Sequence, residues 1–314
     1  MLNNYQPQPI KLIKITPQAT GIKLFRFEFL DRDFGKNFKF SPGQFIQLSI
    51  PGFGEGPFAP CGDSNEKYIE FCVRNAGRLT EKIHSLKVGG KAAIRGPYGN
   101  GWILPCHCEE SATKQSRNIT AINYSSEDNG NNLRLLRCPA AASAPRNDSC
   151  RKNLLIIVGG LGFVPLRSLI LGKEKFFGKD SKFQIFYGAK NPDEMLFRYE
   201  YNRWRENNIE LRLTTDKECA GWAGCVGLVT TLFDKFPPAE NSRAFVCGPP
   251  VMYKSAIAKL KEKNFADEDI FLSLERRMHC AVGVCQHCAV GPYYTCKDGP
   301  VFRYDKIKDI EGAI

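Results

Sequence analysis

Apolar and polar residues alternate along much of the first hundred positions, and turn residues separate the alternating runs. The runs are Ile10–Ile15, Ile22–Phe29, Gln44–Ile50, Tyr68–Arg74 and Lys91–Arg95. A period of two residues places the apolar side chains of a strand on one face of a sheet. The pattern therefore predicts an antiparallel β-barrel over residues 1–104. Apolar residues at Leu79, Ile83 and Leu86 predict one short helix within it.

From Asn153 onward, continuous apolar runs alternate with helical segments. Such runs are typical of strands that are buried on both faces of a parallel sheet. The expected strands are Leu154–Val158, Phe183–Ala189, Ile209–Thr215 and Arg243–Cys247, and helices are expected after the first turn, around Met195–Glu206 and up to about Lys263. This order predicts an α/β domain over residues 153–270, with ligands bound at the carboxyl ends of the strands.

Residues 105–152 break both patterns, because the stretch is rich in Ser, Asn and Ala without a helical or strand period. A metal site is one interpretation of its Cys and His side chains, but Cys-x-Cys without a regular second half is not a standard ligand pattern. Those side chains are Cys106, His107, Cys108, Cys138 and Cys150. The ends of the segment resemble translated palindromic repeat DNA of bacterial genomes. We therefore expect an inserted, exposed and disordered loop without a catalytic role.

Glycine-rich turns precede two of the expected helices. Gly77 stands before the short helix, and Gly159-Gly-Leu-Gly162 follows the first buried strand, with Pro165 in the first helical turn. The free N–H groups of a helix N-terminus favour a phosphate, although a plain helix cap is the alternative at Gly77. A third glycine-rich stretch, Gly96–Gly101, is suited to close approach of a ligand or another domain.

Four cysteines near the C-terminus have the spacing C-x4-C-x2-C-x7-C. They are Cys280, Cys285, Cys288 and Cys296. The first three follow the plant-type spacing for a [2Fe–2S] cluster, and glycines between ligands let N–H groups turn toward the sulfurs. A structural zinc site is the alternative, but zinc sites usually pair two C-x2-C units. His279 and His287 flank ligands, and we expect ligation by cysteine alone.

Composition and charge narrow the class of protein. The 314 residues suggest two domains with a small appendage, and 44 Lys and Arg against 33 Asp and Glu give a net charge of +11. The basic residues are scattered, which favours a solvated surface over an acidic docking partner and argues against nucleic acid. No apolar run is long enough to span a membrane and no signal peptide is visible, so we expect a cytoplasmic protein whose thiols are reduced and free to bind metal.

In this context, residues 1–104 resemble the FAD-binding barrel of the ferredoxin reductase family. The resemblance implies that Gly77, Leu79 and Thr80 bind the flavin pyrophosphate and that Cys72, Val73 and Arg74 lie along the flavin. The family's Arg-x-(Tyr/Ser)-(Ser/Thr) motif is replaced here by a stretch without the Arg or the hydroxyl. That stretch contains Pro57, Phe58 and Ala59, and members of the family related to hydrogenase gamma subunits have a similar Gly-Glu-x-Pro-Phe run.

The glycine turn at residue 159 and the later Cys-Gly-Pro-Pro-x-Met run resemble the NAD(P) domain of the same family. The implied nucleotide contacts are Gly159, Gly160, Gly162, Pro165, Tyr187, Gly188, Ala189, Asp216, Cys247, Gly248, Pro249 and Met252. The resemblance places Cys247 near the nicotinamide, whereas a small buried residue is the alternative. Asp216 at a strand end favours NAD, and NADP stays open.

The whole order is an FAD barrel (1–104), the insertion (105–152), an NAD(P) domain (153–270) and a cysteine lobe (271–314). This order resembles the electron-transfer subunits of sulfhydrogenases, anaerobic sulfite reductase and dihydroorotate dehydrogenase. A flavin exchanges both hydride and single electrons, so it must lie between nicotinamide and cluster, and no catalytic side chain is needed. We expect a partner oxidoreductase subunit or a ferredoxin. The alternatives are a stand-alone NAD(P)H:ferredoxin reductase and a zinc-bearing module that has lost flavin.

Overall fold

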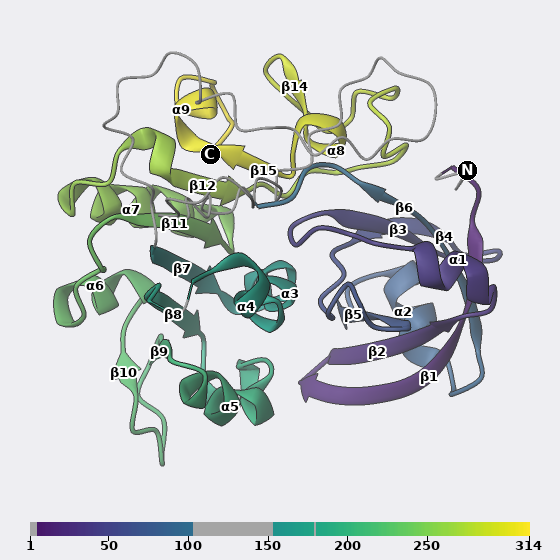
Figure 1. Cartoon of the computed structure of the whole chain (residues 1–314), viewed down its shortest axis with the longest axis horizontal. Coiled ribbons are helices and arrows are strands. Elements are labelled where there is room, and N and C mark those ends of the chain that lie inside the picture. The colour runs from purple at the N-terminus through teal and green to yellow at the C-terminus, as the bar shows by residue number, and fades with distance from the viewer. Residues whose placement is uncertain (1–4, 103–152, 179) are drawn as a thin grey trace, which may run out of the picture.

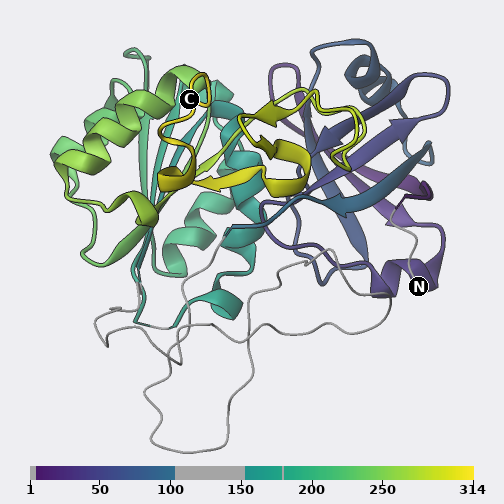
Figure 2. The same cartoon turned by 90° about the horizontal axis from the view of Figure 1, so that it is seen from above.

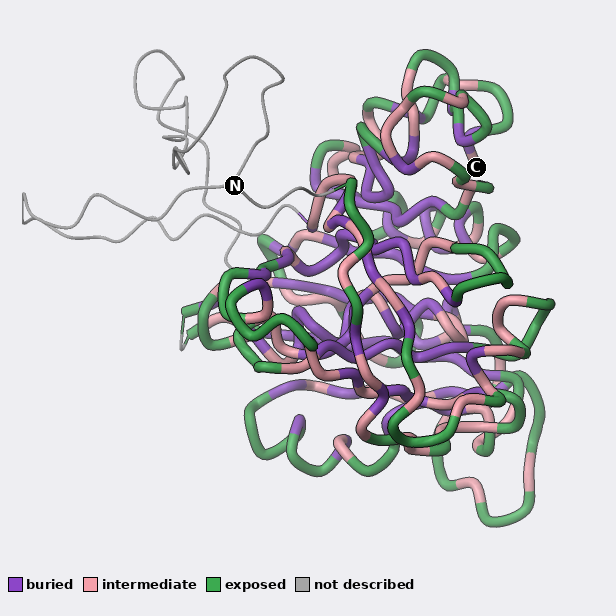
Figure 3. The backbone as a smooth tube through the Cα atoms, turned by 90° about the vertical axis from the view of Figure 1, so that its right-hand side faces the viewer, coloured by how far each residue is buried: buried purple, intermediate pink, exposed green. Residues whose placement is uncertain are grey.

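The computed structural model describes residues 5–102, 153–178 and 180–314. An antiparallel sheet and a parallel sheet lie side by side, and the C-terminal segment runs across both (Figures 1 and 2). Figure 3 shows buried residues along the strands and exposed residues mainly in the connecting loops. The expected insertion at 105–152, with its five candidate metal ligands, lies outside the described residues.

The N-terminal half forms a six-stranded antiparallel sheet in the order β4-β3-β6-β1-β2-β5. Its strands are β1 (Gln8–Ala19), β2 (Ile22–Phe29), β3 (Phe45–Ile50), β4 (Gly54–Phe58), β5 (Tyr68–Arg74) and β6 (Lys91–Tyr98). The predicted antiparallel architecture is confirmed, but within the described residues the ladder does not close into a barrel. A single bridge between Pro60 and Phe71 links the segment after β4 to β5 at the open side.

The alternation of apolar and polar residues does not predict two elements of this half. Strand β4 is glycine-rich and pairs with β3 without an apolar face of its own. Helix α1 (Arg32–Asn37) begins where the Asp31 carboxylate accepts hydrogen bonds from the N–H groups of Asp33 and Phe34, at 2.9 and 3.0 Å. The predicted short helix is α2 (Arg78–Ser85), which buries Ile83.

The second sheet has seven strands in the order β10-β9-β8-β7-β11-β12-β15. They are β7 (Asn153–Gly159), β8 (Phe183–Ala189), β9 (Ile209–Thr215), β10 (Cys225–Val226), β11 (Ser242–Cys247), β12 (Ile270–Ser273) and β15 (Val301–Arg303). All neighbours pair in parallel except β12 and β15, which are antiparallel. The predicted α/β domain is confirmed, and the C-terminal segment adds β15 as an edge strand.

Helices cover both faces of the parallel sheet. One face packs against α3 (Val164–Leu171) and α5 (Tyr201–Glu206), and the other packs against α6 (Leu232–Lys235) and α7 (Pro250–Glu262). The other helical segments are α4 (Lys173–Phe176), α8 (Thr295–Asp298), α9 (Tyr304–Ile307) and the 3₁₀ turns η2 (Gly160–Phe163), η3 (Pro192–Glu194), η4 (Arg198–Glu200), η5 (Val229–Thr231) and η6 (Asp267–Asp269). Of the helix expected around 195–206, only α5 is α-helical; the 3₁₀ turn η4 precedes it, and Phe197 before that turn has a positive φ of 56°.

The two sheets are joined by a buried chain of charges. The guanidinium of Arg167 on α3 donates to Glu70 Oε2 on β5 and to the Cys61 carbonyl, both at 2.8 Å. Its other nitrogens donate to the Glu200 carboxylate at 2.5 to 3.2 Å. Arg26 donates to the second oxygen of Glu70 at 2.9 Å. Arg167 is 5% exposed and Glu70 is 2% exposed, so these charges satisfy one another almost without water.

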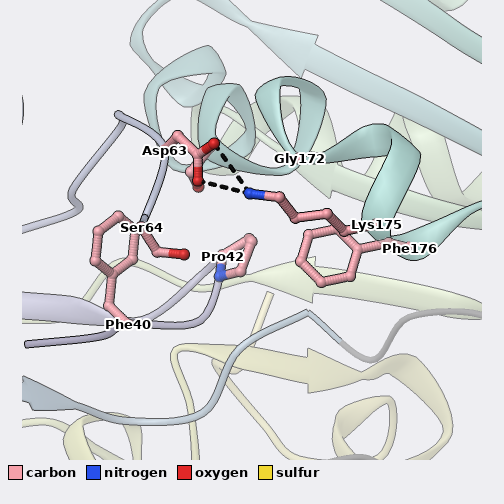
Figure 4. Close-up of a pocket in the computed structure, with 8 residues that line it drawn as sticks. Phe40, Pro42, Asp63, Ser64, Gly172, Lys175 and Phe176 are labelled. Atoms are coloured by element: carbon pink, nitrogen blue, oxygen red, sulfur yellow. Dashed lines mark hydrogen bonds and ion pairs between the residues drawn. The ribbon is translucent and has the colours of Figure 1, made fainter. Parts of the chain in front are cut away.

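A second ion pair crosses the same seam at its surface. Lys175 Nζ lies 2.9 and 3.0 Å from the two carboxylate oxygens of Asp63, beside a pocket that also includes Phe40, Pro42 and Phe176 (Figure 4). This pocket contains none of the side chains predicted to bind a cofactor. The Lys175 side chain is 45% exposed, so water screens the pair.

Replacement of Arg167 by methionine should strongly destabilise the protein. The change removes the cation and leaves two carboxylates at the buried seam, which costs about 3–5 kcal/mol in comparable buried pairs. The matched control Lys175→Met removes a cation from the same seam at its exposed edge and should cost at most about 1 kcal/mol. Denaturant midpoints of both variants give the comparison. Equal, small losses would show that the buried network does not hold the two sheets together.

Candidate functional site

The four C-terminal cysteines lie on a loop whose backbone N–H groups point at sulfur. The N–H groups of Val282, Val284 and Cys285 lie 3.3 to 3.4 Å from Cys280 Sγ. The N–H of Gly283 lies 3.2 Å from Cys296 Sγ. Positive φ angles at Ala281, Gly283 and Gln286 turn the backbone inward, as the sequence analysis expected of the glycine. N–H groups in this position stabilise negative charge on sulfur.

The four thiols interact with one another. Cys280 interacts with Cys285, and Cys296 interacts with both Cys288 and Cys280. Hydrogen bonds from the backbone N–H groups of His287 and Cys280 lower the pKa of Cys285 to about 7. Burial raises the pKa of Cys296 to about 12. Cys288 and Cys296 are each 1% exposed, whereas Cys280 and Cys285 are half-buried.

Four thiols could hold either a binuclear cluster, in which each iron takes two cysteines, or a single zinc ion. The five N–H···S contacts fit the predicted [2Fe–2S] cluster, because such contacts stabilise the negative charge that reduction adds.

The cysteine loop is packed against the antiparallel sheet. Phe45 of β3 and Tyr98 of β6 form one apolar cluster with Ala281, Cys288 and Cys296. This contact places the thiols of Cys288 and Cys296 directly against the antiparallel sheet. In Figure 1 the loop and α8 lie above the ends of β3 and β6.

Polar contacts fasten the same junction. The Asn100 side chain donates to the carbonyls of Asp298 and Val301 at 2.8 and 3.0 Å and accepts from the Val301 N–H at 3.1 Å. A Cβ on Gly99 would lie 2.4 Å from the Gly299 carbonyl oxygen, so a side chain cannot fit there. The glycine-rich stretch that followed the last predicted strand therefore serves close approach between domains.

The predicted flavin residues gather around β4, β5 and α2. Pro57 and Phe58 lie on β4, Ala59 follows it, and Cys72, Val73 and Arg74 end β5. Leu79 of α2 lies under β4, where it would meet a Cβ on Gly56 at 3.2 Å. Space is open around Gly77, because a Cβ there would meet nothing within 4 Å.

The N-terminus of α2 keeps the character expected for a phosphate. The Thr80 hydroxyl accepts from the N–H groups of Ala76 and Gly77 at 2.9 Å, which fixes the turn. The first N–H groups of any helix lack intrahelical acceptors. With open space over Gly77, these groups fit a pyrophosphate, and the assignment of Gly77, Leu79 and Thr80 to flavin remains a prediction.

Some of the residues predicted to bind flavin face the parallel sheet. Cys72 and Cys61 belong to the same apolar cluster as Phe163 and Tyr187, and Ala59 packs against it. Burial raises the pKa of Cys61 to about 12 and that of Cys72 well above its usual range. Burial therefore favours the protonated form of both thiols.

The predicted nucleotide residues meet at the carboxyl edge of the parallel sheet. Gly159 pairs with Gly188, and Cys247 pairs with Val158 on the opposite side. A Cβ on Gly162 would lie 2.3 Å from the Cys247 carbonyl oxygen, so only glycine allows this approach. Pro165 stands in the first turn of α3.

The side chains around this edge are mostly apolar. Met252 fills the space over Gly159 and Gly248, beside Pro249. The Tyr187 hydroxyl donates to the Gly160 carbonyl at 3.3 Å and accepts from the Leu196 N–H. Ala189 is buried at the end of β8.

Two further residues of the edge were predicted to contact the nucleotide. The Asp216 side chain is exposed just beyond β9, while its N–H donates to Ala189 at 3.1 Å. Burial raises the pKa of Cys247 to about 12, and this thiol is 3% exposed. The geometry fits a nucleotide at this edge, although each contact stays a prediction.

Several residues of the site escaped the sequence analysis. Arg167 is a charged residue within an otherwise mostly apolar helix. That unusual position could have indicated that its side chain is buried and paired with an acid. Glu70 occupies a polar position of an alternating strand, which normally faces solvent. Arg95 gave no signal, because it donates to Glu55 and to the Cys280 carbonyl, and both acceptors are distant in the sequence.

Comparison with known proteins identifies two domains. Residues 275–308 match the model of the iron–sulfur cluster binding domain of dihydroorotate dehydrogenase B. Residues 156–257 match the oxidoreductase NAD-binding domain. The first match covers all four cysteines and favours the cluster over zinc.

Relatives cover nearly the whole chain. Sulfhydrogenase 2 subunit gamma of Pyrococcus furiosus is 35% identical over 299 residues, which is 90% of this chain and 88% of the relative. A probable dihydroorotate dehydrogenase B (NAD(+)) electron transfer subunit of Thermococcus kodakarensis is 28% identical, with 85% and 83% covered. The fold is similar to a solved NADH-dependent reduced ferredoxin–NADP oxidoreductase, with a TM-score of 0.66, 20% identity and 95% and 91% covered.

These matches confirm the resemblance drawn from the motifs. The chain belongs to the family of sulfhydrogenase gamma subunits and dihydroorotate dehydrogenase B electron-transfer subunits.

Proposed function

We propose that this protein is the electron-transfer subunit of an oxidoreductase complex and carries electrons between NAD(P)H and a partner subunit through FAD and a [2Fe–2S] cluster. One observation carries the proposal: a single antiparallel sheet contacts both other sites. Through Ala59 and Cys72 it faces the apolar cluster beside the nucleotide edge, and through Phe45 and Tyr98 it holds the cysteine loop.

Each group has residues that fit it. Gly77, Leu79 and Thr80 would hold the FAD pyrophosphate, and Pro57–Ala59 with Cys72–Arg74 would line the ring. The glycine turn at 159–162 and the Cys247–Met252 segment would hold NAD(P)H. Flavin, when bound, supplies the exchange between two-electron and one-electron chemistry that nicotinamide and cluster require.

The protein's own residues orient and shield these groups. Buried Phe163, Tyr187 and Cys247 exclude water from the nucleotide edge. Burial favours the protonated form of the Cys72 and Cys247 thiols, and hydride transfer needs no acid–base side chain. We therefore assign no catalytic residue, in agreement with the sequence analysis. The exposed Cys280–Cys285 side of the loop, with Val284 at 76% exposure, is the side open to a partner.

The partner is an oxidoreductase subunit, and relatives support a hydrogenase type in particular. The relative with 35% identity carries the name of a sulfhydrogenase gamma subunit. Within the described residues, no helix has the length and apolar character that crossing a membrane requires.

Anaerobically purified protein should show flavin bands together with a broad iron–sulfur shoulder, and NADH or NADPH should bleach both. Flavin, iron and acid-labile sulfide analysis completes the measurement, and the faster of the two nucleotides identifies the donor. Rapid reduction of added ferredoxin by NAD(P)H, without a partner subunit, would instead favour a stand-alone ferredoxin reductase. A colourless protein that contains zinc would contradict the proposal.

Replacement of Cys288 by serine should abolish the iron–sulfur shoulder but leave the flavin bands. The buried thiol interacts with Cys296 and accepts the Cys296 N–H, so its loss removes one iron ligand. Cys219→Ser is a matched control, because this free cysteine lies in the loop after β9, away from the lobe. Iron content should fall only in the first variant. Equal iron in both variants would exclude Cys288 as a ligand.

A further inference from the structure

Arg95 links the antiparallel sheet to the first cysteine of the loop. Its Nη2 atom donates to the Cys280 carbonyl at 3.1 Å. The same guanidinium forms a two-point ion pair with Glu55 of β4, with Nε 2.9 Å from Glu55 Oε2. Its Nη1 atom donates to the Tyr98 hydroxyl at 2.9 Å. All of its nitrogens therefore have acceptors, and the cation is held in one orientation.

The charge of this guanidinium is permanent and poorly screened. The Arg95 side chain is 12% exposed, and that of Glu55 is 34% exposed. The hydrogen bonds that Arg95 donates to the Glu55 carboxylate are the largest cause that raises the pKa of Arg95. A cation held at low exposure acts on nearby charge more strongly than one in open water.

The same junction touches both halves of the cysteine site. Arg95 bonds to the backbone of Cys280, while its partner Tyr98 packs with Cys288 and Cys296. Gln47 of β3, which is 1% exposed, donates to the neighbouring His279 carbonyl at 3.4 Å. The sheet thus places one fixed cation and one fixed anion beside the loop that would hold the cluster.

We propose that the Arg95–Glu55 pair sets the reduction potential of the iron–sulfur cluster, with Arg95 as a positioning and tuning residue. This inference rests on the proposed function, because it requires that the four cysteines hold a cluster. Reduction adds one negative charge to the cluster, so a nearby cation favours the reduced form and a nearby anion disfavours it. Potentials of such clusters respond to local charge and hydrogen bonding.

The two partners of the pair make a sharp test, because breaking the pair from either side has opposite electrostatic effects. Arg95→Met removes the cation and should shift the cluster potential to more negative values. Glu55→Gln removes the anion, keeps an acceptor for Arg95, and should shift the potential to more positive values. A purely structural role predicts the same direction in both variants, since each one loosens the same junction.

The measurement is an EPR-monitored redox titration of the cluster in purified, cluster-loaded full-length protein. Arg95→Lys keeps the charge and should remain closer to the wild type than Arg95→Met. Lys175→Met, which removes a cation at the other seam, should leave the potential unchanged. If Arg95→Met fails to load a cluster, Arg95→Gln, which also removes the cation but keeps a hydrogen-bond donor, takes its place in the comparison with Glu55→Gln.

The outcomes distinguish a failure of the proposed function from a failure of the role assigned to the Arg95–Glu55 pair. A wild-type protein without any cluster signal would overturn the proposed function itself. A normal cluster signal with unchanged potentials, or with shifts in one direction for both variants, would overturn only the role of the Arg95–Glu55 pair. Shifts of opposite sign would establish it.

Discussion

The seam between the two sheets depends on a buried group of charges around Arg167. A helix that follows the nucleotide turn carries this arginine, and its main partner, Glu70, lies on a strand of the flavin-type sheet. Buried ions tolerate little displacement, because each one needs its counter-charge at hydrogen-bonding distance. The relative position of the two ligand-binding edges is therefore tied to a few hydrogen bonds.

The cysteine lobe is held by a different kind of constraint. Its chain leaves the nucleotide sheet after β12 and returns to it as β15. Between these strands it rests on the other sheet through Asn100, Arg95 and the Phe45–Tyr98 cluster. The cysteine lobe thus contacts both sheets, and a shift at the seam between the sheets would also strain the lobe. This arrangement ties the cysteine lobe to both sheets.

Sequence reasoning located the elements with strong periodicity and missed those without it. The alternating strands and the apolar parallel strands were found, whereas glycine-rich β4 and the capped helix α1 were not. The positive φ of Phe197, whose N–H donates to Gln18 at 3.0 Å, also interrupts the N-terminal part of the helix expected around 195–206. The predicted closure of the barrel is not seen among the described residues. A local pattern of apolar residues cannot predict closure, since closure depends on how β4 and β5 meet across the sheet.

The sequence by itself determined the family, the spacing of the four cysteines and the glycine turns, because spacing and backbone freedom are local properties. It also indicated that nicotinamide, flavin and cluster chemistry belong together. Only the tertiary structure decided which side chains control the junctions. The charged residues at these junctions are far apart along the chain: Glu55, Arg95, Glu70 and Arg167. The sequence does not indicate which charged residues pair, because folding alone brings the partners together. Burial and pairing are properties of the fold, so they became visible only in the assembled molecule.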